Sequence, residues 1–189
     1  MAGAFPMSLP KLSDQQIARA IQQVATYIEQ QPQIYRGVAA PLDKRQSTAM
    51  QPFFSTSVLD STRVIVLSGQ RASNPPFYIE FIKMGFEAGS LPDFALMKAI
   101  TLLDTVISHE PLTDRLLFHE LVHIVQYQKL GVADFAAKYV TGFLRSGGSY
   151  EFIPLEMNAY ELDARFALAP TKTFSVEAEV ETWIRTNRF

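Results

Sequence analysis

Residues 116 to 128, LLFHELVHIVQYQ, are the segment that most limits how this chain can fold. Thr113 or Asp114 can cap a helix that runs through the segment to about Leu130. Gly131 follows, and glycine is the residue type that most often ends a helix on its carboxyl side. The pattern therefore predicts a long helix, against which the other elements must pack.

The same segment contains the pattern HExxH, formed by His119, Glu120 and His123. At about 100° per residue, the two histidines lie one turn apart and roughly opposite an apolar stripe, so both imidazoles can reach one point beside the helix. Two imidazoles on one helix supply most of a catalytic zinc site. Glu120 is placed to accept a proton from an activated water instead of binding the metal. The stripe consists of Leu117, Leu121 and Ile124.

An ordinary packing helix is the alternative interpretation, in which the two histidines only satisfy polar contacts. Two of the three histidines in the chain fall within the pattern, and the helix has its own start and stop signals. These observations favour a bound Zn²⁺. Because two histidines do not hold zinc well enough, a third protein ligand is required.

A later helix, predicted over residues 154–168, offers carboxylates for this role. Glu156 lies at the edge of the apolar face, near Ala159, whose small side chain lets the metal helix approach closely. Glu161 points about 140° away from Glu156, toward solvent. We therefore predict Glu156 as the third ligand. The alternatives that stay open are Glu151, Asp163 and His109.

The remaining pattern predicts an α+β fold. Residues 36–60 contain two prolines and no clear period, so they are expected to be mostly loop, and residues 1–12 a loose lead-in. A helix followed by strands and then by helices favours a small, mostly antiparallel sheet packed against several helices, in one domain over residues 1–189. Helices are expected over residues 13–31, 114–130, 132–144, 154–168 and 175–185, and strands over residues 62–68, 77–86 and 99–108.

Composition excludes several classes of protein. The apolar fraction of 48% and charged fraction of 19% suit a globular domain, and the net charge of −2 gives no reason to expect nucleic acid as a partner. The absence of cysteine excludes disulfides and thiolate zinc ligands. Apolar runs are too short for a membrane span. No secretory signal is seen at the start, so a cytoplasmic location is expected, with non-classical export left open.

The stretch FHELVHIVQYQ, followed by IPLEMNAYE, resembles the small bacterial zinc-peptidase-like domains of the gluzincin group. The resemblance covers about residues 99–166. It implies a zincin-like fold in which His119, His123 and Glu156 hold the zinc and Glu120 is the catalytic base.

Two departures from the thermolysin-like pattern accompany this resemblance. That pattern has an aspartate four residues after the ligand glutamate, where this chain has Tyr160. A carboxylate that orients a zinc histidine must then come from elsewhere, and Asp163 is the candidate. The short N-A-x pattern of the substrate-binding edge strand is also missing from residues 99–108.

The resulting prediction is a zinc-dependent peptidase that hydrolyses a peptide or protein substrate. Zinc would activate a water, and Glu120 would take its proton and pass it to the leaving amine. Tyr150 and Tyr160 flank Glu156 and are candidates to stabilise the developing oxyanion. An edge strand over residues 99–108 could align an extended substrate. The alternative is a zincin-like domain that binds metal without turnover, as an interaction or scaffold module; an intact Glu120 favours the enzyme.

Overall fold

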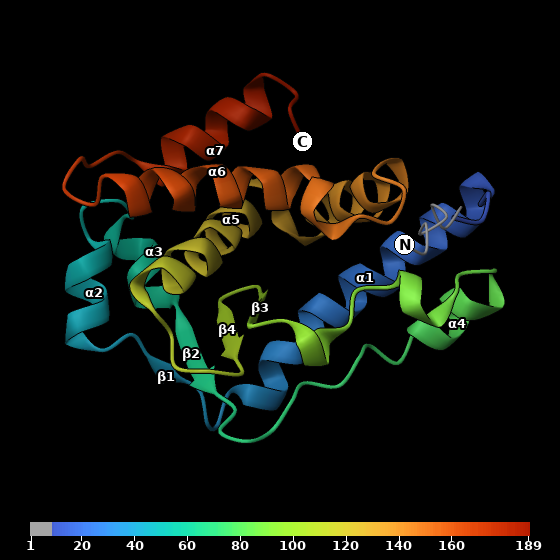
Figure 1. Cartoon of the computed structure of the whole chain (residues 1–189), viewed down its shortest axis with the longest axis horizontal. Coiled ribbons are helices and arrows are strands. Elements are labelled where there is room, and N and C mark those ends of the chain that lie inside the picture. The colour runs from blue at the N-terminus through green and yellow to red at the C-terminus, as the bar shows by residue number, and fades with distance from the viewer. Residues whose placement is uncertain (1–8) are drawn as a thin grey trace, which may run out of the picture.

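The computed structural model describes residues 9–189, and helices form the larger part of it (Figure 1). The helices are α1 (Asp14–Tyr35), α2 (Lys44–Met50), α3 (Thr56–Ser61), α4 (Tyr78–Lys83), α5 (Asp114–Arg145), α6 (Pro154–Leu168) and α7 (Val176–Arg185), with short 3₁₀ turns η1 (Ala88–Ser90), η2 (Phe94–Leu96) and η3 (Tyr150–Phe152). The strands are β1 (Ala40–Pro41), β2 (Arg63–Val66), β3 (Ala99–Leu102) and β4 (Thr105–Ser108). This is an α+β fold, as predicted.

The four strands form one sheet in the order β1-β2-β4-β3. The pairs β1–β2 and β3–β4 are antiparallel, whereas β2–β4 is parallel, so the sheet is mixed rather than mostly antiparallel. The prediction of a single strand over residues 99–108 is wrong. A tight turn at Leu103 and Asp104 divides this segment into the two strands of a hairpin. Leu103 has a φ of 57°, which reverses the chain between Leu102 and Thr105.

Two other segments differ from the prediction. The loop expected over residues 36–60 contains β1, α2 and α3, because Asp43 and Ser55 each cap a short helix through their side chains. The strand expected over residues 77–86 is helix α4 with a turn at Gly85, where φ is 101°. Short apolar runs of this kind do not distinguish strand from helix by period alone.

The helices that have strong start signals in the sequence agree better with the predicted bounds. Thr113 caps α5, which kinks at Gly131, where the φ and ψ angles of 74° and 165° are not helical. The kink separates the two helices predicted on either side of it. Helix α6 has the predicted bounds, and α7 begins after its cap at Ser175. Helix α1 continues beyond the predicted end at residue 31 and passes through Pro32.

Helix α5 lies at the centre of the fold, with α6 and α7 on one side and the sheet and α1 on the other (Figure 1). Its first half joins an apolar cluster that includes Phe53, Phe118 and Phe166. Its second half joins a second cluster with α1 and β3. Leu9 and Leu12 pack against this second cluster, so this part of the expected lead-in is not loose, while residues 1–8 lie outside the described residues. Among residues 9–189, no helix is both long and apolar enough to cross a membrane.

The close approach of α5 and α6 requires glycine at position 142. A Cβ there would lie 2.8 Å from Cδ of Pro154 and 3.2 Å from Cγ2 of Ile153. Overpacking costs about 1–3 kcal/mol, and the better helix propensity of alanine offsets about 1 kcal/mol of it. Gly142→Ala should therefore lower the free energy of unfolding by up to about 2 kcal/mol in urea denaturation. Gly89→Ala, with no atom within 4 Å, is the control; equal stability of both variants would contradict the tight contact.

Candidate metal centre

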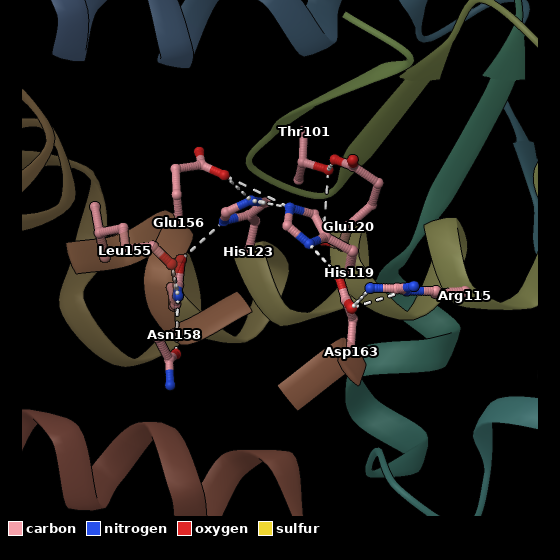
Figure 2. A network of polar contacts seen from close by, with 10 residues as sticks. Thr101, Arg115, His119, Glu120, His123, Leu155, Glu156, Asn158 and Asp163 are labelled. Carbon is pink, nitrogen blue, oxygen red and sulfur yellow. Dashed lines mark hydrogen bonds and ion pairs between the residues drawn. The ribbon is translucent and has the colours of Figure 1, made fainter. Parts of the chain in front are cut away.

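Three buried side chains from two helices converge on one point (Figure 2). The Nε2 atoms of His119 and His123 are 3.2 Å apart, and Oε2 of Glu156 lies 3.5 Å from the first and 3.4 Å from the second. Their exposed fractions are 7%, 6% and 2%. The structure thus brings together the three residues that the sequence predicted as metal ligands.

Helix packing explains why Glu156 reaches the histidines. It lies in the first turn of α6, which begins at Pro154, a residue suited to that position because it has no N–H to donate. Leu155, Ala159 and Leu162 on the same helix are almost fully buried. Ala159 is small enough to let α6 approach α5, as the sequence suggested.

A carboxylate holds the first histidine. Nδ1 of His119 is 2.9 Å from Oδ2 of Asp163, and Arg115 donates from Nε and Nη2 to Oδ1 of the same carboxylate at 2.9 and 2.7 Å. An ionised carboxylate only accepts hydrogen bonds, so Nδ1 of His119 carries the proton. Asp163 therefore has the orienting position suggested from the sequence, and it is not a third ligand.

An amide holds the second histidine. Nδ1 of His123 is 2.9 Å from Oε1 of Gln126, whose Nε2 donates to the carbonyl oxygen of Leu155 and to Oδ1 of Asn158, both at 2.9 Å. Because a backbone carbonyl can only accept, the amide nitrogen must face Leu155 and the amide oxygen must face His123. Nδ1 of His123 is therefore also the protonated nitrogen.

These two hydrogen-bond chains direct both Nε2 lone pairs at the same point. In neutral form, His119 and His123 would face each other with two lone pairs at 3.2 Å, next to a carboxylate oxygen. The arrangement is repulsive unless a positive charge lies between the three atoms. A proton or a metal cation can supply it.

Glu156 is within ion-pair distance of both imidazoles, and the spacing of the three atoms also suits a bound metal. Charge-assisted N–H···O bonds are about 2.7–2.9 Å long, whereas Glu156 is 3.4 and 3.5 Å from the imidazoles, and its buried Oε2 has no hydrogen-bond partner. Tetrahedral ligands at about 2.0–2.2 Å from a zinc ion lie about 3.3–3.6 Å from one another. Two neutral imidazoles and a carboxylate are also a donor set that suits zinc. The residues present therefore fit this cation.

Without a metal, the same cluster holds protons. Burial acts to lower the pKa of His119, but Asp163, Glu156 and the charge of Glu120 together outweigh it and raise the pKa to about 10. Burial likewise opposes ionisation of Glu156, but the two histidines hold its pKa well below the ordinary value. A protonated histidine would thus replace the cation in the metal-free protein.

Glu120 lies beside the ligands without joining them. Its Oε2 accepts a hydrogen bond of 2.6 Å from Oγ1 of Thr101 on strand β3, and only 4% of the residue is exposed (Figure 2). Glu120 and His123 both line an apolar cavity next to the centre. The carboxylate is therefore held in a fixed position at the edge of a space that a ligand could fill.

The two candidate tyrosines differ in their surroundings. The ring of Tyr160 lies 4.7 Å from that of His119, and 40% of the residue is exposed. Tyr150 lines the apolar cavity together with Glu156, and burial and the charge of Glu156 raise its pKa well above the ordinary value. Both tyrosines stay close to the centre, and their roles remain predictions.

The remaining carboxylate and histidine candidates lie elsewhere. Nε2 of His109 accepts from the N–H of Ala72 at 2.9 Å, and Nδ1 contacts the carbonyl of Met97 at 2.6 Å, so both ring nitrogens are occupied. Glu151 is exposed. Glu161 is exposed as well, as predicted, and pairs with Arg188.

Several supporting residues were not identified from the sequence. Thr101, Arg115, Gln126 and Asn158 take part in the network around the centre. Helical spacing could have found two of them, since Arg115 precedes His119 by one turn and Gln126 follows His123 by nearly one turn. Thr101 and Asn158 belong to other elements, and no local signal marks them.

The hydrogen bond from His119 to Asp163 leads to a prediction. Asp163→Asn keeps an acceptor but removes the negative charge that orients the imidazole and pairs with Arg115. Loss of such a partner typically weakens metal binding by about 10–100-fold, so a similar loss of zinc affinity is expected in competition with a chromophoric chelator. Glu161→Gln, an exposed change on the same helix, should leave the affinity unchanged. Equal affinities would remove Asp163 from the metal centre.

Neither a known protein family, nor a curated protein, nor a solved structure matches this chain. A functional inference therefore has to rest on the converging ligands, the hydrogen bonds that orient them and the cavity beside them.

Proposed function

We propose that the protein is a zinc-dependent hydrolase that cleaves peptide bonds. The convergence of Nε2 of His119, Nε2 of His123 and Oε2 of Glu156, with no hydrogen-bond partner on the last, is the observation that carries the proposal. Three protein ligands leave a fourth tetrahedral position for water or substrate, which is typical of catalytic zinc sites.

Zinc, when bound, would polarise the substrate carbonyl and make a water acidic enough to react near neutral pH. Glu120 is positioned to accept a proton from the attacking water and to deliver it to the departing amine, so that the C–N bond breaks as a C–O bond replaces it. Thr101 holds the Glu120 carboxylate through the 2.6 Å hydrogen bond. Asp163 and Gln126 keep the two imidazoles in the tautomers that place Nε2 toward the centre.

A metal-binding domain without turnover is the second candidate, and the burial of the ligands favours it. His119, His123 and Glu156 are each less than a tenth exposed, which is also typical of structural zinc sites. Glu120 argues for the enzyme, because a metal scaffold has no use for a buried carboxylate that neither belongs to the ligand group nor orients one of its histidines.

Zinc content and chelator-sensitive hydrolysis test the proposal together. The purified protein should contain about one zinc per chain by elemental analysis, or acquire it when zinc is offered at neutral pH. It should cleave casein or a mixed peptide library, stop when a chelator is added, and recover when zinc is restored. Zinc without hydrolysis would leave the scaffold interpretation. No zinc under either condition would overturn both.

A further inference from the structure

An apolar cavity of about 120 Å³ adjoins the candidate metal centre and lies in the second apolar cluster. His123, Glu120 and Glu156 line it where it meets the centre. The rest of the lining comes from α1, the segment around α4, strand β3 and the second half of α5. The two glutamates at the metal centre are the only carboxylates in the lining, which contains no lysine or arginine.

The lining of the cavity spans several turns of two helices. It includes Ala20, Val24 and Ile28 on α1, and Phe135 and Leu144 on α5. At 1.5 Å per residue, these stretches extend for about 12 and 14 Å along their helices. An extended alkyl chain can contact both stretches along their length.

The volume and the lining of the cavity limit which ligands can occupy it. A water needs about 10–15 Å³ of such space, so the cavity has room for about ten non-hydrogen atoms. The hydroxyls of Tyr78 and Tyr127 are already bonded to the carbonyls of Pro92 and Thr101, and Tyr27 and Tyr139 also contribute to the lining. Apart from these tyrosines and the residues of the metal centre, most of the lining is aliphatic or phenylalanine, which favours an apolar occupant.

The edge strand gives a separate argument against an extended peptide in this space. Strand β3 is at the edge of the sheet and is fully buried, and the carbonyl of Thr101 on it accepts from the hydroxyl of Tyr127 at 3.2 Å. A peptide backbone that paired with β3 would have to displace this bond. An alkyl chain forms no hydrogen bonds and would leave this one in place.

We propose that the cavity binds an unbranched, medium-length acyl chain, and that the amide carbonyl of that acyl group lies at the metal centre. The substrate class would then be an N-acylated amine or peptide. Hydrolysis would break the C–N bond of the acyl amide and give a fatty acid and a free amine, with the proton moving through Glu120. The reaction rests on the proposed function, whereas binding of the chain rests on the cavity alone.

The test is a chain-length series on the purified wild-type protein. Unbranched carboxamides of increasing length are titrated into the protein, and isothermal titration calorimetry measures the affinity of each. Affinity should rise about fourfold for each added methylene, the factor that corresponds to full burial of a CH₂ group, and should level off near eight to ten carbons. No dependence on length, or equally strong binding of benzamide or indole carboxamides, would overturn the proposal.

Variants on two faces of α1 provide the control. Ala20→Phe and Val24→Phe introduce a phenyl ring at the cavity lining, and they should shorten the chain length at which affinity levels off. Ala18→Phe makes the same kind of change on the exposed face of the helix and should leave the series unchanged. If the cavity variants fail to fold, the wild-type series still decides the outcome.

Measuring the series with and without zinc separates this inference from the proposed function. Chain-length dependence without zinc binding would support the acyl site and reject the zinc hydrolase. Zinc binding and hydrolysis without chain-length dependence would support the zinc hydrolase and reject the acyl site.

Discussion

Glu156→Ala should lose most of its affinity for zinc while the protein stays folded. The change removes the only anionic ligand and leaves two imidazoles, which do not hold zinc well on their own. Removal of a residue that only orients a ligand costs about 10–100-fold in metal affinity, so loss of the ligand itself should exceed that range. Elemental analysis after dialysis, and titration against a chromophoric chelator, measure the loss.

Glu151→Ala is the matched control for this experiment. It removes a carboxylate close by in the sequence, but an exposed one, and its zinc content should equal that of the wild type. Thermal unfolding adds a second measurement: zinc at about 100 times its Kd should stabilise the wild type by about 2.7 kcal/mol, and should not stabilise Glu156→Ala. Full zinc retention in Glu156→Ala would disprove the three-ligand site.

Glu120→Gln should slow hydrolysis strongly and leave zinc in place. Glutamine has nearly the same shape and can still bond to Thr101, but it cannot take a proton from water. General-base catalysis contributes about 10²–10⁴-fold, so the rate constant kcat should fall by that factor. The measurement is the initial rate on the substrate identified by the cleavage assay, with the zinc content of each preparation determined in parallel.

Glu110→Gln provides the comparison, because Glu110 is an exposed carboxylate paired with Lys98 and lies outside the centre. Its rate should match that of the wild type. Activity that survives Glu120→Gln at full zinc content would contradict the mechanism while leaving the metal centre intact.

Local signals along the chain explain most of what could be predicted. The cap at Thr113 and the spacing of His119 and His123 involve residues within one or two turns of each other, so the helix and the shared face of its two histidines follow from sequence alone. Helix α6 was predicted for the same reason, since Pro154 marks its start. By contrast, residues 77–86 contain an apolar run that suits both strand and helix. The segment is helical in the structure, where Phe81 and Phe86 share an apolar cluster with residues of α1.

The sequence by itself determined the two helices and the HExxH pattern on the first of them, and it made Glu156 the best candidate for a third ligand. The tertiary structure alone decided that Glu156 meets His119 and His123, that Asp163 and Gln126 orient them, and that Thr101 holds Glu120. It also created the apolar cavity between α1 and α5. The physical reason is distance along the chain: helix caps and turns act over a few residues, whereas these contacts join elements whose relative position depends on how the two apolar clusters pack.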